Sequence, residues 1–336
     1  MKDVAAKAGV HHSTVSLCLK NSSRISRATK DRILTLAREM GYRPHPYLST
    51  LMHTRRRGRV SGSSEVLALV IFTSPDANWK RWLGEFKDEM EPARTQARAR
   101  GFKLEFFEVS PEKFGPRRMG DILYSRNIKG VLLGPWHHSQ ETFDWQWERF
   151  TVVALGPSLH EPRIHRVRHH HFQAMLTAVN ECHRLGYRRV GLTLKAEINR
   201  KLDQRWLASY LMKRYEAPCA DPPEPHISES WTRESFLDWF EAQRPDAIIT
   251  INVSDAKAWL TSAGCRIPRD VGLVGLSVPR SSTQTGIYQD WPTQGRRATT
   301  LLIDLLRENA AGLDNHPNTL LVNGVWIPGS TVRKQL

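Results

Sequence analysis

The stretch Gly9-Val10-His11-His12-Ser13-Thr14-Val15-Ser16 contains the turn between two short apolar-faced segments and the start of the second one, near the start of the 336-residue chain. The first segment, residues 3–8, stops at Gly9, and glycine readily adopts the positive φ that turns a chain sharply between helices. In the second segment, residues 12–20, Val15 and Leu19 are four residues apart and share one helical face. The spacing predicts two short helices joined by a tight turn, with a small polar face left free on the second.

A third helix is expected after Ser26, a favourable N-cap residue, and it should end at Gly41. Basic charge is concentrated in the same region. Residues 1–60 contain thirteen Lys and Arg against three acidic residues, a net charge of +10 out of +15 for the whole chain. A compact helix-turn-helix unit with this excess suits phosphate neutralisation and counterion release on DNA. The alternative is a solvated basic helical domain, and the charge alone does not separate the two.

Four short motifs in this region have family-specific spacing. They are D-V-A-x-x-A-G-V at 3–10, S-T-V-S at 13–16, R-I-S-x-x-T at 24–29 and G-Y-R-P at 41–44. The start of the chain resembles the LacI/GalR (lactose-repressor) family of transcription factors over about fifty residues. The resemblance implies that residues 12–20 form the recognition helix.

The resemblance also assigns DNA contacts to individual residues. It places His12, Ser13 and Leu17 at base edges, and it places a second set near phosphates: His11, Thr14, Ser16, Ser26, Thr29 and Tyr42. Two positions depart from the family, because Leu17 stands where Arg is usual and Lys20 where Asn is usual. Leucine offers an apolar contact, such as one to a thymine methyl, in place of a bidentate guanine contact. We therefore expect an operator that differs from the family's common one.

Residues 44–64 read as a hinge and linker. Pro46 suits the first position of a helix too short to be stable alone in water. This segment is similar to the family's hinge helix, and the resemblance makes Leu51 the residue that wedges into the minor groove. The alternative is an ordinary interdomain linker. The basic run at 55–59, which includes Arg56, is expected to add phosphate contacts.

Composition excludes several classes of protein. No apolar run approaches the roughly 20 residues of a membrane span, and no signal-peptide pattern begins the chain, so we expect a cytoplasmic protein with no membrane partner. The four cysteines, Cys18, Cys182, Cys219 and Cys265, form no C-x-x-C pair, which argues against a disulfide framework or a zinc finger. No Walker loop, G-x-S-x-G or G-x-G-x-x-G motif is present. We expect no cofactor, no metal and no enzymatic activity.

From Glu65 onward, buried-strand patterns alternate with helix-length amphipathic patterns. Expected strands cover 66–72, 103–109, 130–134, 151–156, 189–194, 247–251 and 271–276, and expected helices cover 79–100, 116–127, 173–186, 200–215, 255–263 and 292–310. This alternation indicates βαβ units and parallel sheets. The predicted fold is α/β, with a helix-turn-helix headpiece (1–43), a hinge and linker (44–64) and a core (65–336) of two doubly wound lobes.

The core resembles the family's effector-binding domain, which is similar to periplasmic sugar-binding proteins. The resemblance rests on 244–248, 267–275, 295–298 and 329–333, and it implies a homodimer and a ligand cleft between two lobes with crossing strands. By position it assigns six residues to that cleft: Ser74, Trp136, Arg205, Asn252, Ser277 and Trp291. Ser277 stands where the family commonly has a sugar-binding carboxylate.

Histidines cluster at 160–171, with His137 and His138 nearby. A metal site is one interpretation, and a polar loop at the lobe crossover is the one we favour, because adjacent residues of a strand point to opposite faces and no Cys or paired acid is near. Arg163, Arg166 and Arg168 in the same stretch could instead meet an anionic effector.

The sequence thus predicts a DNA-binding transcriptional repressor that acts on a pseudo-palindromic operator under the control of a small-molecule effector, a carbohydrate or a derivative of one. Two alternatives remain open. One is a carbohydrate-binding protein with a vestigial headpiece, and the other is a regulator that has lost small-molecule control or responds to an acidic or phosphorylated ligand.

Overall fold

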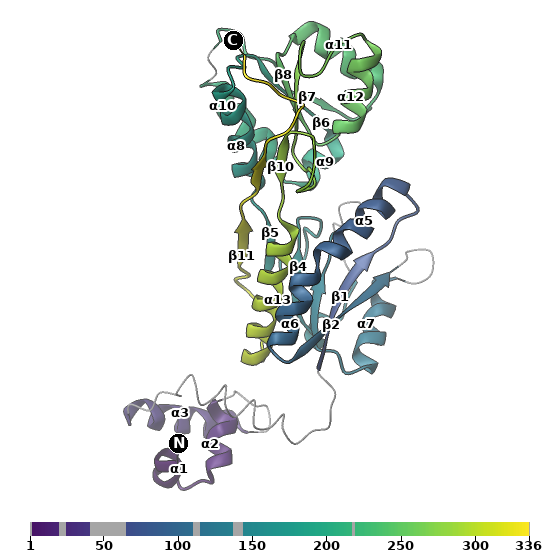
Figure 1. Cartoon of the computed structure of the whole chain (residues 1–336). Coiled ribbons are helices and arrows are strands. Elements are labelled where there is room, and N and C mark those ends of the chain that lie inside the picture. The colour runs from purple at the N-terminus through teal and green to yellow at the C-terminus, as the bar shows by residue number, and fades with distance from the viewer. Residues whose placement is uncertain are drawn as a thin grey trace. The chain divides into compact units, whose positions relative to one another are not determined.

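The computed structural model describes residues 2–19, 25–40, 65–109, 115–136, 144–216 and 219–335. The chain folds into two compact units, an amino-terminal helical headpiece and a larger α/β core, which we take in turn (Figure 1).

The headpiece contains the three expected helices: α1 (Lys2–Ala8), α2 (His12–Leu19) and α3 (Arg27–Glu39). Gly9 has a φ of +63° in the turn between α1 and α2, which confirms its predicted role. Ser26 caps α3, where its Oγ accepts a hydrogen bond from the backbone N–H of Thr29 at 3.3 Å. The helices enclose a small apolar core made by Val4, Ala5, Val15, Cys18, Ile33 and Ala37. The side chain of Leu19 lies outside the described residues.

The first lobe of the core is built on a sheet with strand order β11-β5-β4-β3-β1-β2 in the described residues. Its strands are β1 (Glu65–Phe72), β2 (Phe102–Val109), β3 (Gly130–Leu133), β4 (Thr151–Leu155), β5 (Arg166–His169) and β11 (Thr319–Val322). Its helices are α5 (Ala77–Glu89), α6 (Glu91–Ala99), α7 (Pro116–Ser125), the 3-10 helix η1 (Trp147–Arg149) and α13 (Trp291–Glu308). Residues 67–72 of β1 are all buried, which explains their continuous apolar run.

The second lobe repeats this plan, with strand order β12-β10-β9-β8-β6-β7 among the described residues. Its strands are β6 (Val190–Lys195), β7 (His226–Ser228), β8 (Ala247–Thr250), β9 (Gly272–Gly275), β10 (Gly286–Tyr288) and β12 (Val325–Ile327). Its helices are α8 (His171–Arg184), α9 (Ala196–Lys201), α10 (Arg205–Arg214), α11 (Arg233–Gln243) and α12 (Val253–Ser262). Apolar clusters on opposite faces of the sheet join it to α8 and α10 and to α11 and α12. The predicted doubly wound α/β fold is confirmed.

Three chain segments connect the lobes (Figure 1). β5 leads into α8, β10 leads into α13, and β11 leads into β12. These segments crowd together at Gly324, where an added Cβ would lie 2.6 Å from His169 Cε1 and 2.9 Å from the Tyr288 carbonyl oxygen. Since β5 and β10 each leave their own lobe at the carboxyl end, the carboxyl ends of both parallel sheets face this crossing. We call the residues that follow those strand ends the lobe junction.

Several expected elements differ from the observed ones. The helix expected over 79–100 is two helices, because Pro92 stands in the first turn of α6 and the chain breaks at Met90. The helix expected over 200–215 is also two, α9 and α10, separated by Asp203 and Gln204, whose φ angles are +51° and +56°. The polar loop expected around His169 is instead the buried strand β5 followed directly by α8.

Candidate functional sites in the headpiece and at the lobe junction

Helix α2 presents part of the predicted DNA-binding set. His11 and Ser13 are exposed at its start, and His11 Nδ1 lies 2.8 Å from Ser13 Oγ. Thr14 and Leu17 are partly exposed, while Val15 between them is fully buried against α3. The polar face is therefore held outward by the packing of the opposite face.

Of the remaining predicted DNA contacts, the structure describes the side chains of two. Ser26 and Thr29 lie together at the start of α3, with their hydroxyl oxygens 2.8 Å apart. The side chains of His12 and Ser16 lie outside the described residues, as do Lys20, Tyr42, Leu51 and Arg56. The hinge and linker expected over 44–64 also lie outside them.

At the lobe junction, the six predicted effector residues follow strand ends or begin helices. Ser74 follows β1 and accepts a hydrogen bond from the backbone N–H of Asp76 at 3.3 Å. Trp136 follows β3, and its buried ring stacks on Phe72 with a centroid separation of 4.3 Å. Trp291 begins α13 and meets Phe86 edge-on at 5.3 Å. All three belong to the first lobe.

The second lobe contributes the other three. Asn252 follows β8, and its Oδ1 is buried without a hydrogen-bond partner among the described residues. Ser277 follows β9 and is half-buried. Arg205 begins α10, and its Nη2 donates to Asp203 Oδ2 at 2.9 Å. Asp203 is a junction residue that the sequence did not reveal.

Asp203 joins the two lobes. Besides Arg205, its carboxylate contacts two groups of the first lobe, Arg168 Nη1 at 3.4 Å and His160 Nδ1 at 3.3 Å. Partial burial opposes ionisation of this carboxyl group, but the hydrogen bond from Arg205 and the surrounding positive charges hold its pKa below the ordinary value. Asp203 is therefore ionised at neutral pH.

Lys201, two residues earlier, makes a second link between the lobes. Its Nζ donates to the carbonyl oxygen of Trp136 at 2.6 Å and lies 5.8 Å from the ring centroid of Trp79. Burial lowers the pKa of Lys201 to about 8. No local sequence motif marks Lys201 or Asp203, because their role depends on the turn between α9 and α10.

Buried polar atoms without a partner gather around these links. In the described part of the chain they include Arg168 Nε, both ring nitrogens of His169, His171 Nδ1, Asn199 Oδ1, Arg205 Nε, Trp206 Nε1 and Asn252 Oδ1, which lie on β5 and on, or at the start of, α8, α9, α10 and α12. Buried polar groups are normally hydrogen-bonded, so such a concentration marks a place where a polar ligand can supply the missing partners.

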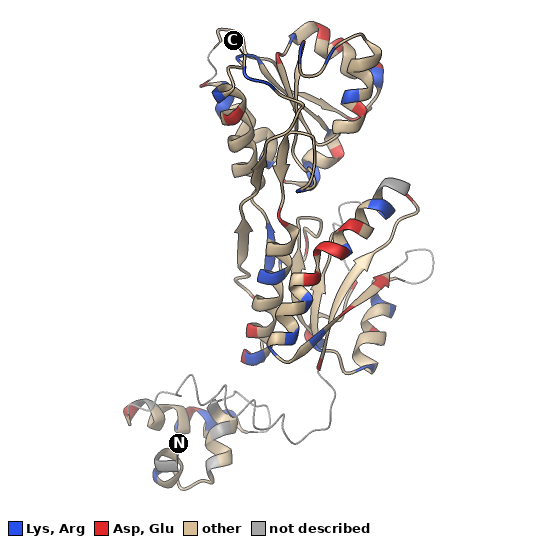
Figure 2. Cartoon of the chain, viewed as in Figure 1, with Lys and Arg blue, Asp and Glu red and all other residues tan. Residues whose placement is uncertain are grey.

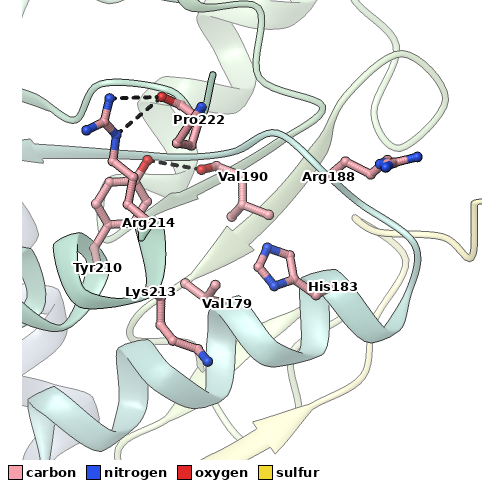
Figure 3. A pocket seen from close by; sticks show the side chains of 8 residues that line it. All are labelled: Val179, His183, Arg188, Val190, Tyr210, Lys213, Arg214 and Pro222. Atoms are coloured by element: carbon pink, nitrogen blue, oxygen red, sulfur yellow. Dashed lines mark hydrogen bonds between the residues drawn. The ribbon is translucent and has the colours of Figure 1, made fainter. Parts of the chain in front are cut away.

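A separate hollow lies in the second lobe between α8, α10 and the start of β6 (Figure 3). Tyr210 donates a hydrogen bond from its hydroxyl to the Val190 carbonyl at 3.0 Å, and Arg214 donates from Nε and Nη2 to the Pro222 carbonyl at 3.2 and 3.1 Å. These side chains already have internal partners. None of the predicted effector residues lines this hollow.

Two further properties of the described residues bear on function. No group of three or more His, Cys, Asp or Glu side chains there is placed to hold a metal ion. His137 and His138 lie outside that set. Among the described helices, none combines the length and apolarity that crossing a bilayer requires.

Two family models match the two parts of the chain. Residues 1–45 match the model described as bacterial regulatory proteins, lacI family, and residues 179–332 match the periplasmic binding protein-like domain. Residues 1–45 are a LacI-family regulatory domain. The whole chain is 25% identical over 332 residues to the HTH-type transcriptional repressor CytR of Escherichia coli (strain K12), covering 93% of this chain and 91% of that repressor. It is 24% identical to the repressor MelR of Bacillus subtilis (strain 168), covering 96% of both chains.

Solved structures share the fold of this protein. A transcriptional regulator CelR–cellobiose complex superimposes with a TM-score of 0.60 at 20% sequence identity. A lac repressor dimer bound to operator and the anti-inducer ONPF superimposes with a TM-score of 0.56 at 16% sequence identity. Each comparison covers 98% of both chains. Both curated relatives named above are transcriptional repressors, and the family model that matches residues 1–45 describes bacterial regulatory proteins.

Proposed function

We propose that this protein is a LacI-family repressor that binds a pseudo-palindromic operator as a homodimer and that a small polar effector, a carbohydrate or a derivative of one, bound at the lobe junction controls its affinity for that operator. The observation that carries the proposal is the set of buried, unpartnered polar atoms at the junction, on segments from both lobes. The similarity of the fold to CelR, which was solved as a complex with cellobiose, supports a carbohydrate-like ligand.

The proposed mechanism couples the two units through the chain between them. We propose the limits 1–43 for the headpiece, 44–64 for the hinge and linker, and 65–336 for the core. A ligand that binds one arrangement of the lobes more tightly shifts the protein toward that arrangement, and only this difference in affinity can change operator binding. Asp203 and Lys201 are the described residues whose contacts across the junction such a ligand would alter.

The experiment that tests the proposed function is selection of bound sequences from a random duplex pool at two salt concentrations. We expect an enriched inverted repeat, because a dimer presents two α2 helices to two half-sites. Binding that is only sequence-independent and salt-labile would contradict the repressor function and favour a carbohydrate-binding protein with a vestigial headpiece.

Replacement of Leu17 by alanine should weaken binding to the selected operator about 5- to 100-fold, because losing readout at one base pair costs about 1–3 kcal/mol, as a mismatched base pair does. Affinity for random duplex DNA should stay unchanged, because that affinity rests on phosphate contacts. The matched control is Thr35→Ala, which alters an exposed residue on α3. Electrophoretic mobility shifts on both DNAs measure the effect, and an equal loss on both would show that Leu17 does not read bases.

A further inference from the structure

Positive charge is concentrated on one strand at the lobe junction. Arg166 and Arg168 are two residues apart on β5 and so point to the same face of the sheet. Figure 2 marks Lys and Arg in blue along the ribbon. Arg205 and Lys201 approach the junction from the second lobe. Asp203 forms ion pairs with Arg168 and Arg205, and the charge of Glu161 also acts on Arg166. Around Arg166, three arginines of the described residues therefore face two carboxylates, those of Asp203 and Glu161.

Arg168 is the most enclosed of these cations that faces Asp203. The residue is 8% exposed, its one ion pair is the 3.4 Å contact to Asp203, and its Nε has no partner among the described residues. Burial and the charge of Arg205 lower the pKa of Arg168. A buried guanidinium with one long ion pair is poorly compensated, so a further anion beside it would be stabilising.

Arg166 does not compete for the same carboxylate. It donates hydrogen bonds to the carbonyl oxygens of Gly156 (3.1 Å) and Leu159, in the loop after β4. Its guanidinium is thereby fixed, and its charge adds to that of Arg168. The positive potential on this side of the junction is thus part of the folded framework.

Asp203 occupies the space between Arg168 and Arg205. Its side chain is 43% exposed, and it is carried by a two-residue turn in the left-handed region of φ, a conformation unfavourable for Asp and Gln. Backbone strain of this kind persists where the surrounding structure enforces it. The turn holds the carboxylate of Asp203 against the guanidinium groups of Arg168 and Arg205. An external oxyanion could bind the same two guanidinium groups.

We propose that the effector is an anion, a small polar molecule with a carboxylate or phosphate group that binds Arg168 and Arg205 beside or in place of Asp203. This proposal rests on the proposed function, since it names the class of ligand at the same junction. A guanidinium can donate two parallel, charge-assisted hydrogen bonds to the oxygens of a carboxylate or phosphate, whereas a neutral sugar leaves the positive charge uncompensated.

The test uses the full chain and three matched probes: glucose, gluconate and glucose 6-phosphate, with inorganic phosphate as a fourth, all at constant ionic strength. Thermal unfolding and titration calorimetry report binding. At ten times its Kd an anionic probe should raise the midpoint of unfolding by about 2–5 °C. Glucose should have no comparable effect.

Variants locate the binding. Arg168→Gln should weaken binding of the anionic probe about 10- to 100-fold, and Arg205→Gln should act in the same direction. The matched control is Arg163→Gln in the same segment, because the Arg163 side chain is 84% exposed, and its affinity should stay within about twofold of the wild type. Asp203→Asn should strengthen anion binding several-fold, because it removes the competing charge. A purely structural Asp203 would not produce this gain.

Three results would overturn the proposal. They are glucose binding as tightly as its two anionic relatives, anions binding Arg168→Gln as they bind the wild type, and no response of the wild type to any anion. The first leaves ligand binding at the junction intact and rejects the anionic class alone. Operator selection tests the repressor function separately, so failure of the two proposals can be distinguished.

Discussion

Replacing Gly286 with alanine should lower the free energy of unfolding of the core by about 3 kcal/mol or more. Gly286 of β10 pairs with Gly275 of β9, and an added Cβ would lie 2.2 Å from the Gly275 carbonyl oxygen. The obstacle is backbone, which cannot rotate away as a side chain can. Relief would require β9 and β10 to separate within the sheet of the second lobe.

Urea denaturation followed by circular dichroism measures this effect as a shift in the midpoint. The matched control is Gly84→Ala in α5, where no heavy atom lies within 4 Å of an added Cβ. That change should raise the free energy of unfolding by up to about 1 kcal/mol, because alanine is more favourable than glycine in the interior of a helix. If Gly286→Ala were as stable as the wild type, the close pairing of β9 and β10 would be wrong.

Acid should destabilise the core because two histidines are buried at the lobe crossing. Burial, reinforced by the charge of His170, lowers the pKa of His169 to about 4. Burial also lowers the pKa of His171 well below its usual value, and the charges of His169, Arg168 and Arg205 act in the same direction. Below pH 6.5 the unfolded chain binds protons that the folded chain does not. Stability should therefore fall by roughly 1.4 kcal/mol per pH unit for each histidine, down to about pH 4 for His169.

The measurement is the free energy of unfolding in urea at pH 7, 6, 5 and 4.5. His171→Phe keeps an aromatic ring against Trp206, whose ring centroid lies 5.2 Å from that of His171. This change should remove the part of the acid-induced fall in the free energy of unfolding that is due to His171. His316→Gln alters an exposed histidine and serves as the control. Identical pH dependence in the wild type and His171→Phe would show that His171 is not held neutral by the fold.

Local signals accounted for much of the architecture. Gly9 and Ser26 predicted the ends of the headpiece helices, because a positive φ and an N-cap are properties of single residues. The apolar run of β1 predicted a strand buried on both faces. The break between α5 and α6 was also encoded, by Pro92, but the amphipathic pattern continued across it and hid the boundary. Strands of three residues, such as β7, β10 and β12, are too short to show a pattern.

The lobe junction was predictable only in part. The family resemblance named Arg205, but its partner Asp203 lies on a turn that the sequence presented as continuous helix. His169 and Arg168 read as polar loop residues because their burial depends on the strand passing between two lobes, which is a tertiary property. The sequence did show two arginines, at 166 and 168, that could meet an anion. Their spacing of two places both on one face only if the segment is a strand, as β5 is.

The threefold crossing of the chain limits how this protein can be divided. β11 belongs to the sheet of the first lobe and β12 to that of the second, although only Asn323 and Gly324 separate them. A fragment that ends before β11 would leave an edge strand missing from each sheet at once. Neither lobe can be expressed as one continuous piece, and a gene for the first lobe alone would have to splice residues 65–169 to 291–322. Domain exchange with a relative must accordingly replace both lobes together or rejoin the chain at three places.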